Sequence, residues 1–151
     1  MTNLIMRTFL ISLLAIILQV NPLSVQSANS WIKLNDTSNA IYYSKGWNIL
    51  TQADYSEGTC YKCGDANATA TFFFNGTQGR FYGVKSSNGG LAEIYVDNVY
   101  QTTVDTYNFT FQSNAQLFET TELNDGSHAI KIVVKGTKNT LMCLNEVYTM
   151  G

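Results

Sequence analysis

The chain has no excess of positive charge. Among its 151 residues, nine lysines and arginines stand against eleven aspartates and glutamates, which gives a net charge of −2 at pH 7. Proteins that bind nucleic acid need a basic surface, and an anionic lipid surface attracts the same kind of charge. We therefore expect no nucleic-acid partner and no electrostatic attachment to a membrane.

Motifs for catalysis are equally scarce. The chain has a single histidine, His128, and it has neither a Gly-X-Ser-X-Gly motif nor a glycine-rich phosphate loop that opens a helix. A glycosidase needs two carboxylates across a cleft, and Asp97 with Asp105 is one pair that can be named. A small single domain has little room for such a cleft. The sequence thus predicts a protein that is not an enzyme and has no cofactor.

The N-terminal segment, residues 1–28, has the pattern of a signal peptide. A positive charge precedes the apolar run from Phe9 to Val20, and small residues follow in the stretch VQSANS. The run is too short to span a bilayer comfortably. We predict cleavage after this segment and a secreted, extracellular domain over residues 29–151, with no membrane attachment after cleavage. An uncleaved anchor is the alternative.

The remaining chain of about 122 residues is long enough for one domain with one core. It contains four Asn-X-Thr sequons, at Asn35, Asn67, Asn75 and Asn108. In a eukaryotic secretory pathway, a sequon must be exposed to carry a glycan. Four sequons in so short a chain favour an extracellular surface.

Alternation of apolar and polar residues recurs every eight to twelve residues, and no helical period is sustained. This pattern is typical of an antiparallel sandwich. The clearest predicted strands are ATFFFN, RFYGVK, LAEIYVD and HAIKIVVK. Shorter strands are predicted over Trp31–Leu34, Ile41–Tyr43, Trp47–Leu50, Phe109–Phe111, Gln116–Leu123 and Leu141–Tyr148. The inward side chains that we predict for the core are Phe72, Phe74, Phe81, Ile94, Val96, Ile130 and Ile132.

These strands predict an all-β fold, a jelly-roll β-sandwich of about eight antiparallel strands preceded by a signal-peptide helix. Several stretches also resemble the galactose-binding-like β-sandwich domains of secreted and cell-surface proteins. They are IKLNDTSNAIYYSKGW, YSEGT, ATATFFFNGTQGRFYG, LAEIYVDN and QLFETTELNDGSHAIKIVVKGTKN. The resemblance covers most of the predicted domain and implies the same sandwich. Asn98 departs from it, because a glycine usually follows the strand aspartate.

Aromatic residues cluster in the stretch from 69 to 83, which reads TATFFFNGTQGRFYG. We predict a hairpin here, with Phe73, Arg80 and Tyr82 together on its outer face. Aromatic rings stack on the C–H patches of a pyranose, and a guanidinium donates to its hydroxyls. The alternative is a cross-strand pair that only stabilises the hairpin.

The resemblance implies that a ligand would bind in the loops at one end of the sandwich. Tyr55, Asp97 and Tyr107 lie at or near predicted strand ends and are our main candidates for binding a glycan. Trp47 has the right chemistry as well. Its alternative is packing beneath a loop, since large aromatic side chains are usually well buried.

Three cysteines, Cys60, Cys63 and Cys143, predict one disulfide and one unpaired thiol in an oxidising compartment. Cys60 could bond to Cys63, or either of them could bond to Cys143. The remaining thiol is either free or joins a second chain in a homo-oligomer. With His128, the three cysteines also make a Cys3His zinc set, but export favours disulfides, and we predict no metal.

Two functions are consistent with these features. The first is a secreted carbohydrate-binding, lectin-like module that recognises a glycan or an extracellular glycoprotein through loop aromatics and polar residues. The alternative is a structural or adhesive unit of an extracellular coat or filament, assembled through sheet edges, glycans and the unpaired cysteine. The exposed aromatics favour the first, but resemblance of fold alone cannot decide between them.

Overall fold

The computed structural model describes residues 30–136 and 142–151, so the predicted signal peptide and its helix lie outside the described residues. Within these ranges the regular structure is almost entirely β, and the one helical element is a 3-10 turn, η1 (Ser56–Gly58). No helix in this part of the chain is long and apolar enough to cross a membrane. The strands are β1 (Trp31–Asn35), β2 (Ile41–Tyr43), β3 (Asn48–Thr51), β4 (Thr59–Cys63), β5 (Thr69–Gly76), β6 (Gln78–Lys85), β7 (Leu91–Val96), β8 (Val99–Asp105), β9 (Gln112–Glu119), β10 (Gly126–Val134) and β11 (Met142–Met150).

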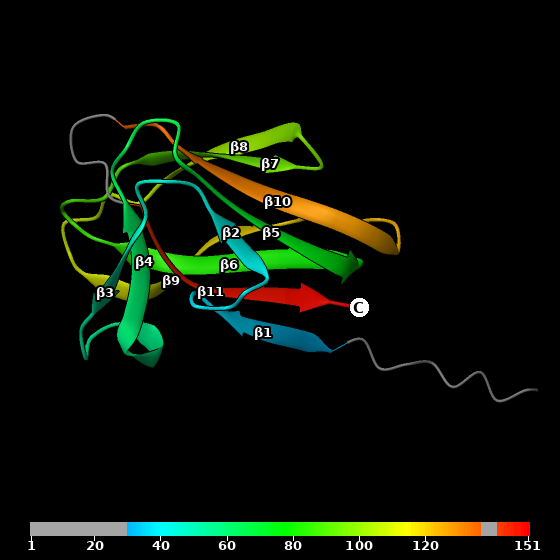
Figure 1. Ribbon diagram of the computed structural model, residues 1–151, viewed down its shortest axis with the longest axis horizontal. Coiled ribbons are helices and arrows are strands. Elements are labelled where there is room, and N and C mark those ends of the chain that lie inside the picture. Colours follow the sequence, from blue (N-terminus) through cyan, green and yellow to red (C-terminus); the bar gives the residue numbers. More distant parts are fainter. Residues whose placement is uncertain (1–29, 137–141) are drawn as a thin grey trace, which may run out of the picture.

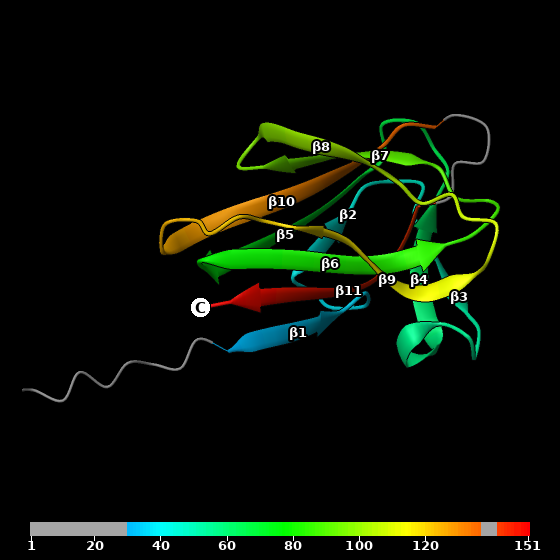
Figure 2. The ribbon, with the colours of Figure 1, turned by 180° about the vertical axis from the view of Figure 1, so that it is seen from behind.

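The strands form two sheets that pack face to face (Figures 1 and 2). The six-stranded sheet has the order β3-β4-β11-β6-β9, with β1 paired to the same edge of β11 as β4; the five-stranded sheet has the order β2-β5-β10-β7-β8. Every pair of these strands is antiparallel. The predicted all-β sandwich is therefore confirmed.

The number and position of the strands differ from the prediction in instructive ways. Two strands were not predicted: β4, because the stretch TCYKC reads as a cysteine motif, and β8. β8 lies at a sheet edge with most of its side chains exposed, so its sequence lacks the alternation that burial of one face imposes. The strand predicted over Phe109–Phe111 is wrong, since those residues form a loop, and the strand predicted over Gln116–Leu123 begins earlier, as β9.

The hairpin predicted over residues 69–83 is also wrong. β5 pairs with β2 and β10, whereas β6 pairs with β11 and β9, so Thr77 marks a crossing from one sheet to the other. At the corner, Gly76 has a φ of +148°, and a Cβ there would collide with the carbonyl oxygen of Met150. Both the backbone angle and the close packing therefore require glycine.

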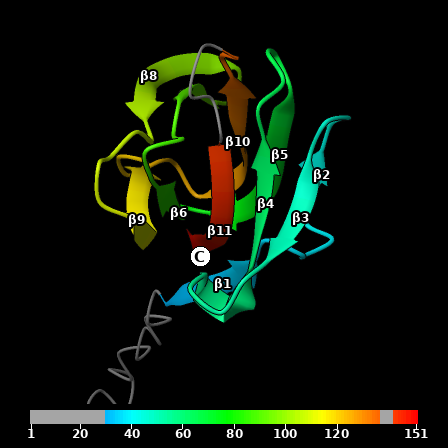
Figure 3. The same ribbon diagram turned by 90° about the vertical axis from the view of Figure 1, so that its left-hand side faces the viewer.

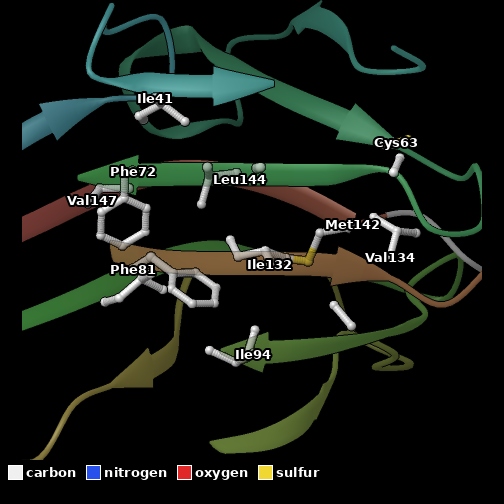
Figure 4. Close-up of a cluster of buried hydrophobic side chains, with 14 of the residues drawn as sticks. Ile41, Cys63, Phe72, Phe81, Ile94, Ile132, Val134, Met142, Leu144 and Val147 are labelled. Atoms are coloured by element: carbon white, nitrogen blue, oxygen red, sulfur yellow. The ribbon is translucent and has the colours of Figure 1, made fainter. Parts of the chain in front are cut away.

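The core lies between the two sheets. All seven side chains predicted for it are buried, and those of Phe72, Phe81 and Ile94 are completely inaccessible to solvent. Figure 4 shows Phe72 and Ile94 of the five-stranded sheet packed with Phe81, Leu144 and Val147, which β6 and β11 contribute from the six-stranded sheet. Alternation along the strands thus identified part of the core, but it missed Leu144 and Val147 on β11 and did not identify the partners of each strand.

A two-residue turn joins β7 to β8 and fixes the position of Asp97. Both turn residues have positive φ, +50° at Asp97 and +66° at Asn98. Asparagine tolerates the left-handed region better than most residues, which explains why Asn98 can stand where the resemblance leads us to expect glycine. The Asp97 carboxylate accepts a hydrogen bond from the Ala129 N–H (2.9 Å) and pairs with His128 (2.7 Å).

The contacts of His128 favour its protonated form. Nδ1 lies 2.7 Å from Asp97 Oδ2 and Nε2 lies 2.7 Å from the Asn124 carbonyl oxygen, and both nitrogens can donate only in the imidazolium. The Asn124 carbonyl and the Asp97 carboxylate raise the pKa of His128 above its ordinary 6.5. Burial would raise the pKa of Asp97, but the bonds from His128 and the Ala129 N–H lower it below 3.8.

The pair should therefore stabilise the protein most between about pH 4 and 6.5. The stabilisation from His128 is complete below the pKa that it has in the unfolded chain, and it is lost as the pH rises through its raised pKa in the folded protein. The stabilisation from Asp97 is complete above the pKa that it has in the unfolded chain, and it is lost as the pH falls through its lowered pKa in the folded protein. Because the pair is partly exposed, we expect the free energy of unfolding to fall by about 1 kcal/mol or less between pH 6 and 8. Urea unfolding at pH 6 and pH 8 measures this difference in the free energy of unfolding. If the His128→Gln variant lost as much stability between the two pH values as wild type, the pair could not be the cause.

A loop cleft as candidate binding site

Loops and strand ends at one end of the sandwich surround a cleft of about 290 Å³. Figure 3 looks onto this end, where β3 and β4 stand beside the ends of β6 and β11. The cleft is lined by Leu50, Tyr55, Lys62, Val84, Ser86, Ser87, Asn88, Phe109, Phe111 and Cys143. The lining thus combines apolar and aromatic side chains with a few polar groups, which is the usual composition of a small-molecule site.

A disulfide joins Cys60 to Cys143, and Cys143 lines the cleft. This bond links β4 to β11, and Leu50 and Tyr55 pack against the cluster that the two cysteines form with Val84. Side chains alternate between the two faces of a strand, so Cys60 and Cys63, three residues apart on β4, point to opposite sides and do not bond to each other. Of the pairings left open by the sequence, the structure selects Cys60 with Cys143.

Cys63 keeps a free thiol in the core of the sandwich. Its residue is only 2% exposed, and burial raises the pKa of the thiol. A thiol in this position cannot reach a second chain while the domain is folded. The zinc set considered above would also require the Cys60–Cys143 bond to be absent.

Two phenylalanines on the loop between β8 and β9 form the outer wall of the cleft. Phe109 is 88% exposed and Phe111 is 46% exposed. The ring of Phe111 contacts that of Tyr55, with 6.1 Å between their centroids. Burial raises the pKa of Tyr55, so its hydroxyl stays protonated and can donate to a ligand. Neither phenylalanine was predicted as a site residue, because both were expected to lie in a strand.

Backbone contacts hold this loop beside the turn that follows β6. Thr106 exchanges hydrogen bonds with Gly90, from Thr106 N–H to the Gly90 carbonyl (2.9 Å) and from Gly90 N–H to Thr106 Oγ1 (2.8 Å). The N–H of Asn108 also donates to the Ser86 carbonyl oxygen at 2.9 Å. These bonds place Ser86, Ser87 and Asn88 opposite the phenylalanines before any ligand arrives.

Lys62 on β4 supplies the charge at the site. It is the one charged side chain among the described residues that line the cleft, and no carboxylate of the described chain pairs with it. With the Tyr55 hydroxyl, the two serines and Asn88, it gives the cleft both donors and acceptors. Such a set can bind sugar hydroxyls while the rings contact the C–H patches of the pyranose.

Comparison with known proteins links the chain to glycan-processing proteins. No family model matches it. It is 35% identical over 115 residues, 76% of its length, to the "A type blood alpha-D-galactosamine galactosaminidase" of Flavonifractor plautii. It is 31% identical over 109 residues, 72% of its length, to the "A type blood N-acetyl-alpha-D-galactosamine deacetylase" of the same organism. The matches span only 11% and 14% of those two relatives.

Solved structures decide the type of fold. A family 35 carbohydrate-binding module from an environmental isolate superposes with a TM-score of 0.60 at 11% identity, covering 80% of this chain and 92% of that one. The CBM36-1 domain of a multidomain xylanase from the hindgut metagenome of Trinervitermes trinervoides gives 0.55 at 12% identity, covering 81% and 97%. The chain has the galactose-binding-like fold of carbohydrate-binding modules.

Two of the main binding candidates lie at the cleft end of this module. Tyr55 lines the cleft itself. Tyr107 is half exposed, and it lies on the same loop as Phe109, paired with Ser86 in an isolated bridge. Asp97 does not join them, because it occupies the β7–β8 turn at the other end of the hairpin. Its contacts with Ala129 and His128 give it a structural role.

Trp47 packs rather than projecting into a site. Its ring lies 5.1 Å from that of Tyr43 and contacts the edge of the core. The indole Nε1 is buried and has no hydrogen-bond partner in the described structure, and it does not line the cleft. The alternative given for Trp47, packing beneath a loop, is the one that the structure supports.

The group predicted from Phe73, Arg80 and Tyr82 does not exist, because β5 and β6 belong to different sheets. Phe73 lies on the outer face of the five-stranded sheet. Arg80 and Tyr82 lie together on the outer face of the other sheet, where the guanidinium carbon is 3.9 Å from the ring centroid of Trp31 and 5.0 Å from that of Tyr148. Stacking on these rings already uses the faces of the guanidinium.

Proposed function

We propose that the domain is a non-catalytic, secreted glycan-binding module whose ligand lies in the cleft between Tyr55, Phe109 and Phe111. The observation that carries this proposal is the exposure of Phe109, 88%, at the rim of a cleft that also holds hydroxyl and amide groups. An apolar ring that packs against so few atoms contributes almost nothing to the free energy of folding. It is well placed to stack on a sugar ring.

The chemistry of the cleft supports binding and not hydrolysis. None of the described lining residues is an aspartate or glutamate, whereas a glycosidase uses two carboxylates. The most buried glutamate, Glu146, lies elsewhere, in an ion pair with Lys33 (2.9 Å). Burial would raise the pKa of Glu146, but bonds from Ser56, Lys33 and Tyr148 lower it, so this side chain is a structural carboxylate and not a general acid.

The relatives suggest which glycans to test first. Both are named for work on A-type blood-group galactosamine, with or without its N-acetyl group, so we propose glycans that end in galactosamine or N-acetylgalactosamine as first candidates. Affinity for a single sugar should be weak, because a shallow cleft buries little ligand surface and such modules gain strength through multivalency. The alternative, a coat protein, relied on an intermolecular disulfide through the unpaired cysteine. That cysteine is Cys63, which is buried and cannot form such a bond in the folded domain.

Phe109→Ala should weaken glycan binding about tenfold, which corresponds to about 1.4 kcal/mol, close to the value of one aromatic stacking contact. It should leave the free energy of unfolding within about 0.5 kcal/mol of wild type, because the ring is almost fully exposed. The measurement is a titration of each protein with a panel of N-acetylgalactosamine, galactosamine and galactose glycosides, followed by NMR.

Phe73→Ala is the matched control, because Phe73 is also an exposed phenylalanine but lies on the outer face of a sheet, away from the cleft lining. Its affinity should equal that of wild type. Absence of saturable binding by wild type up to millimolar sugar would reject the proposed function. Equal affinity of wild type and Phe109→Ala would reject the cleft as the site.

A further inference from the structure

An exposed aromatic pair stands on the outer face of the five-stranded sheet. Tyr42 on β2 is 62% exposed and Phe73 on β5 is 55% exposed. Their ring centroids are 5.8 Å apart with an interplanar angle of 75°, so one ring meets the other edge-on. Figure 1 shows β2 and β5 side by side at this face. The cleft does not include either residue, so the proposed glycan site leaves the pair unexplained.

Asn75, the acceptor of the Asn75-Gly76-Thr77 sequon, lies two residues after Phe73 on the same strand. Side chains two apart in a strand share a face and are separated by about 6.6 Å, roughly the width of a pyranose ring. Asn75 is exposed, and its side chain makes no hydrogen bond among the described residues. The attachment atom is therefore free of bonds to the described residues and lies on the same face of the strand as the ring.

The neighbouring strand leaves room above this part of the sheet. In the register of β10, Ser127 lies opposite Asn75 and Ala129 lies opposite Phe73. Both are small residues, so no tall side chain of β10 competes for the face of the Phe73 ring. A sugar attached to Asn75 can fold back over Ala129 and contact that ring.

The other three sequons lack this arrangement. The residue two positions before the acceptor is Lys33 for Asn35, Asp65 for Asn67 and Thr106 for Asn108. None of these side chains offers an aromatic face. The chain thus contains one sequon that is preceded by an aromatic residue on the same face and three that serve as internal controls.

We propose that Asn75 is an N-glycosylation site whose first N-acetylglucosamine stacks on Phe73 and covers the Tyr42–Phe73 pair. The donor is a lipid-linked oligosaccharide diphosphate of the secretory pathway. The bond from sugar C1 to the diphosphate oxygen breaks, a bond from C1 to Asn75 Nδ2 forms, and the amide nitrogen gives up one proton as the lipid diphosphate leaves. This proposal is independent of the cleft and goes beyond glycan recognition.

The test compares unfolding temperatures of the full chain secreted from eukaryotic cells. Asn75→Gln, which removes the glycan, should lower the melting temperature by about 3 °C in the wild-type background, because the aromatic pair is exposed again. In the Phe73→Ala background the same substitution should change nothing, since the stacking partner is already absent. Asn35→Gln is the matched control, because Asn35 is also an exposed sequon acceptor at the end of a strand but has Lys33 two positions before it, and it should have no effect in either background.

Two further measurements make the result decisive. Peptide mapping after enzymatic deglycosylation in heavy-oxygen water reports whether Asn75 is occupied, and an unoccupied Asn75 overturns the proposal. The same variants made in bacteria, without glycans, report the effect of the Asn75→Gln side chain alone, which should be nil. An equal loss of melting temperature in the wild-type and Phe73→Ala backgrounds would show that the glycan does not act through Phe73.

Discussion

Phe72→Ala should lower the free energy of unfolding by about 3 to 5 kcal/mol, the usual cost of truncating a large aromatic side chain in a core. Phe72 is completely buried, and it lies opposite Ile41 on β2 and Ile130 on β10, at the middle of three strands. Its ring centroid is 6.3 Å from that of Phe74. The large residual cavity would open between the two sheets, where neither sheet can close it without moving several strands.

Urea unfolding of both proteins made in bacteria measures this effect, provided that the slope against urea is unchanged. Phe73→Ala is the control, because it removes the same number of atoms one residue along the strand from a side chain that is 55% exposed. It should cost less than about 1 kcal/mol. If Phe72→Ala and Phe73→Ala lowered the free energy of unfolding by similar amounts, the assignment of Phe72 to the inward face of β5 would be wrong.

The success of the core prediction and the failure of the hairpin prediction have one cause. Alternation is a local property, so Phe72 and Phe81 could be assigned to the interior from their own strands. Strand pairing depends on residues far away in sequence. The short link at Thr77 resembles a hairpin turn, and only the contact of Gly76 with Met150, 74 residues later, reveals that the chain changes sheets there.

The candidate site was predicted in part for the same reason. Tyr55 could be chosen because it is a large polar aromatic residue near a predicted strand end. Phe109 and Phe111 could not, because their place at the cleft depends on the bonds between Thr106 and Gly90, which join two loops that are separate in the sequence. The local pattern pointed the wrong way, because Tyr107, Phe109 and Phe111 alternate with polar residues as one face of a strand does.

Removal of the disulfide in a Cys60→Ser, Cys143→Ser double variant should lower the free energy of unfolding by about 2 to 5 kcal/mol. The bond joins residues 83 positions apart, so its loss frees a long loop in the unfolded chain. It should also impair glycan binding, because Tyr55 and Leu50 pack against the cluster that the two cysteines form with Val84. Affinity should fall even at low temperature, where the variant is still folded.

Cys63→Ala is the control, because Cys63 lies on the same strand but contributes no disulfide. The substitution removes one buried sulfur atom, so it should cost only about 1 kcal/mol and leave binding intact. Wild-type protein treated with a reductant should then match the double variant in both stability and affinity. A thiol titration should find one reactive group in the unfolded wild type and none in the folded protein, because Cys63 is buried. Peptide mapping that found Cys63 in a disulfide, or a double variant as stable as wild type, would contradict the role given to the Cys60–Cys143 bond.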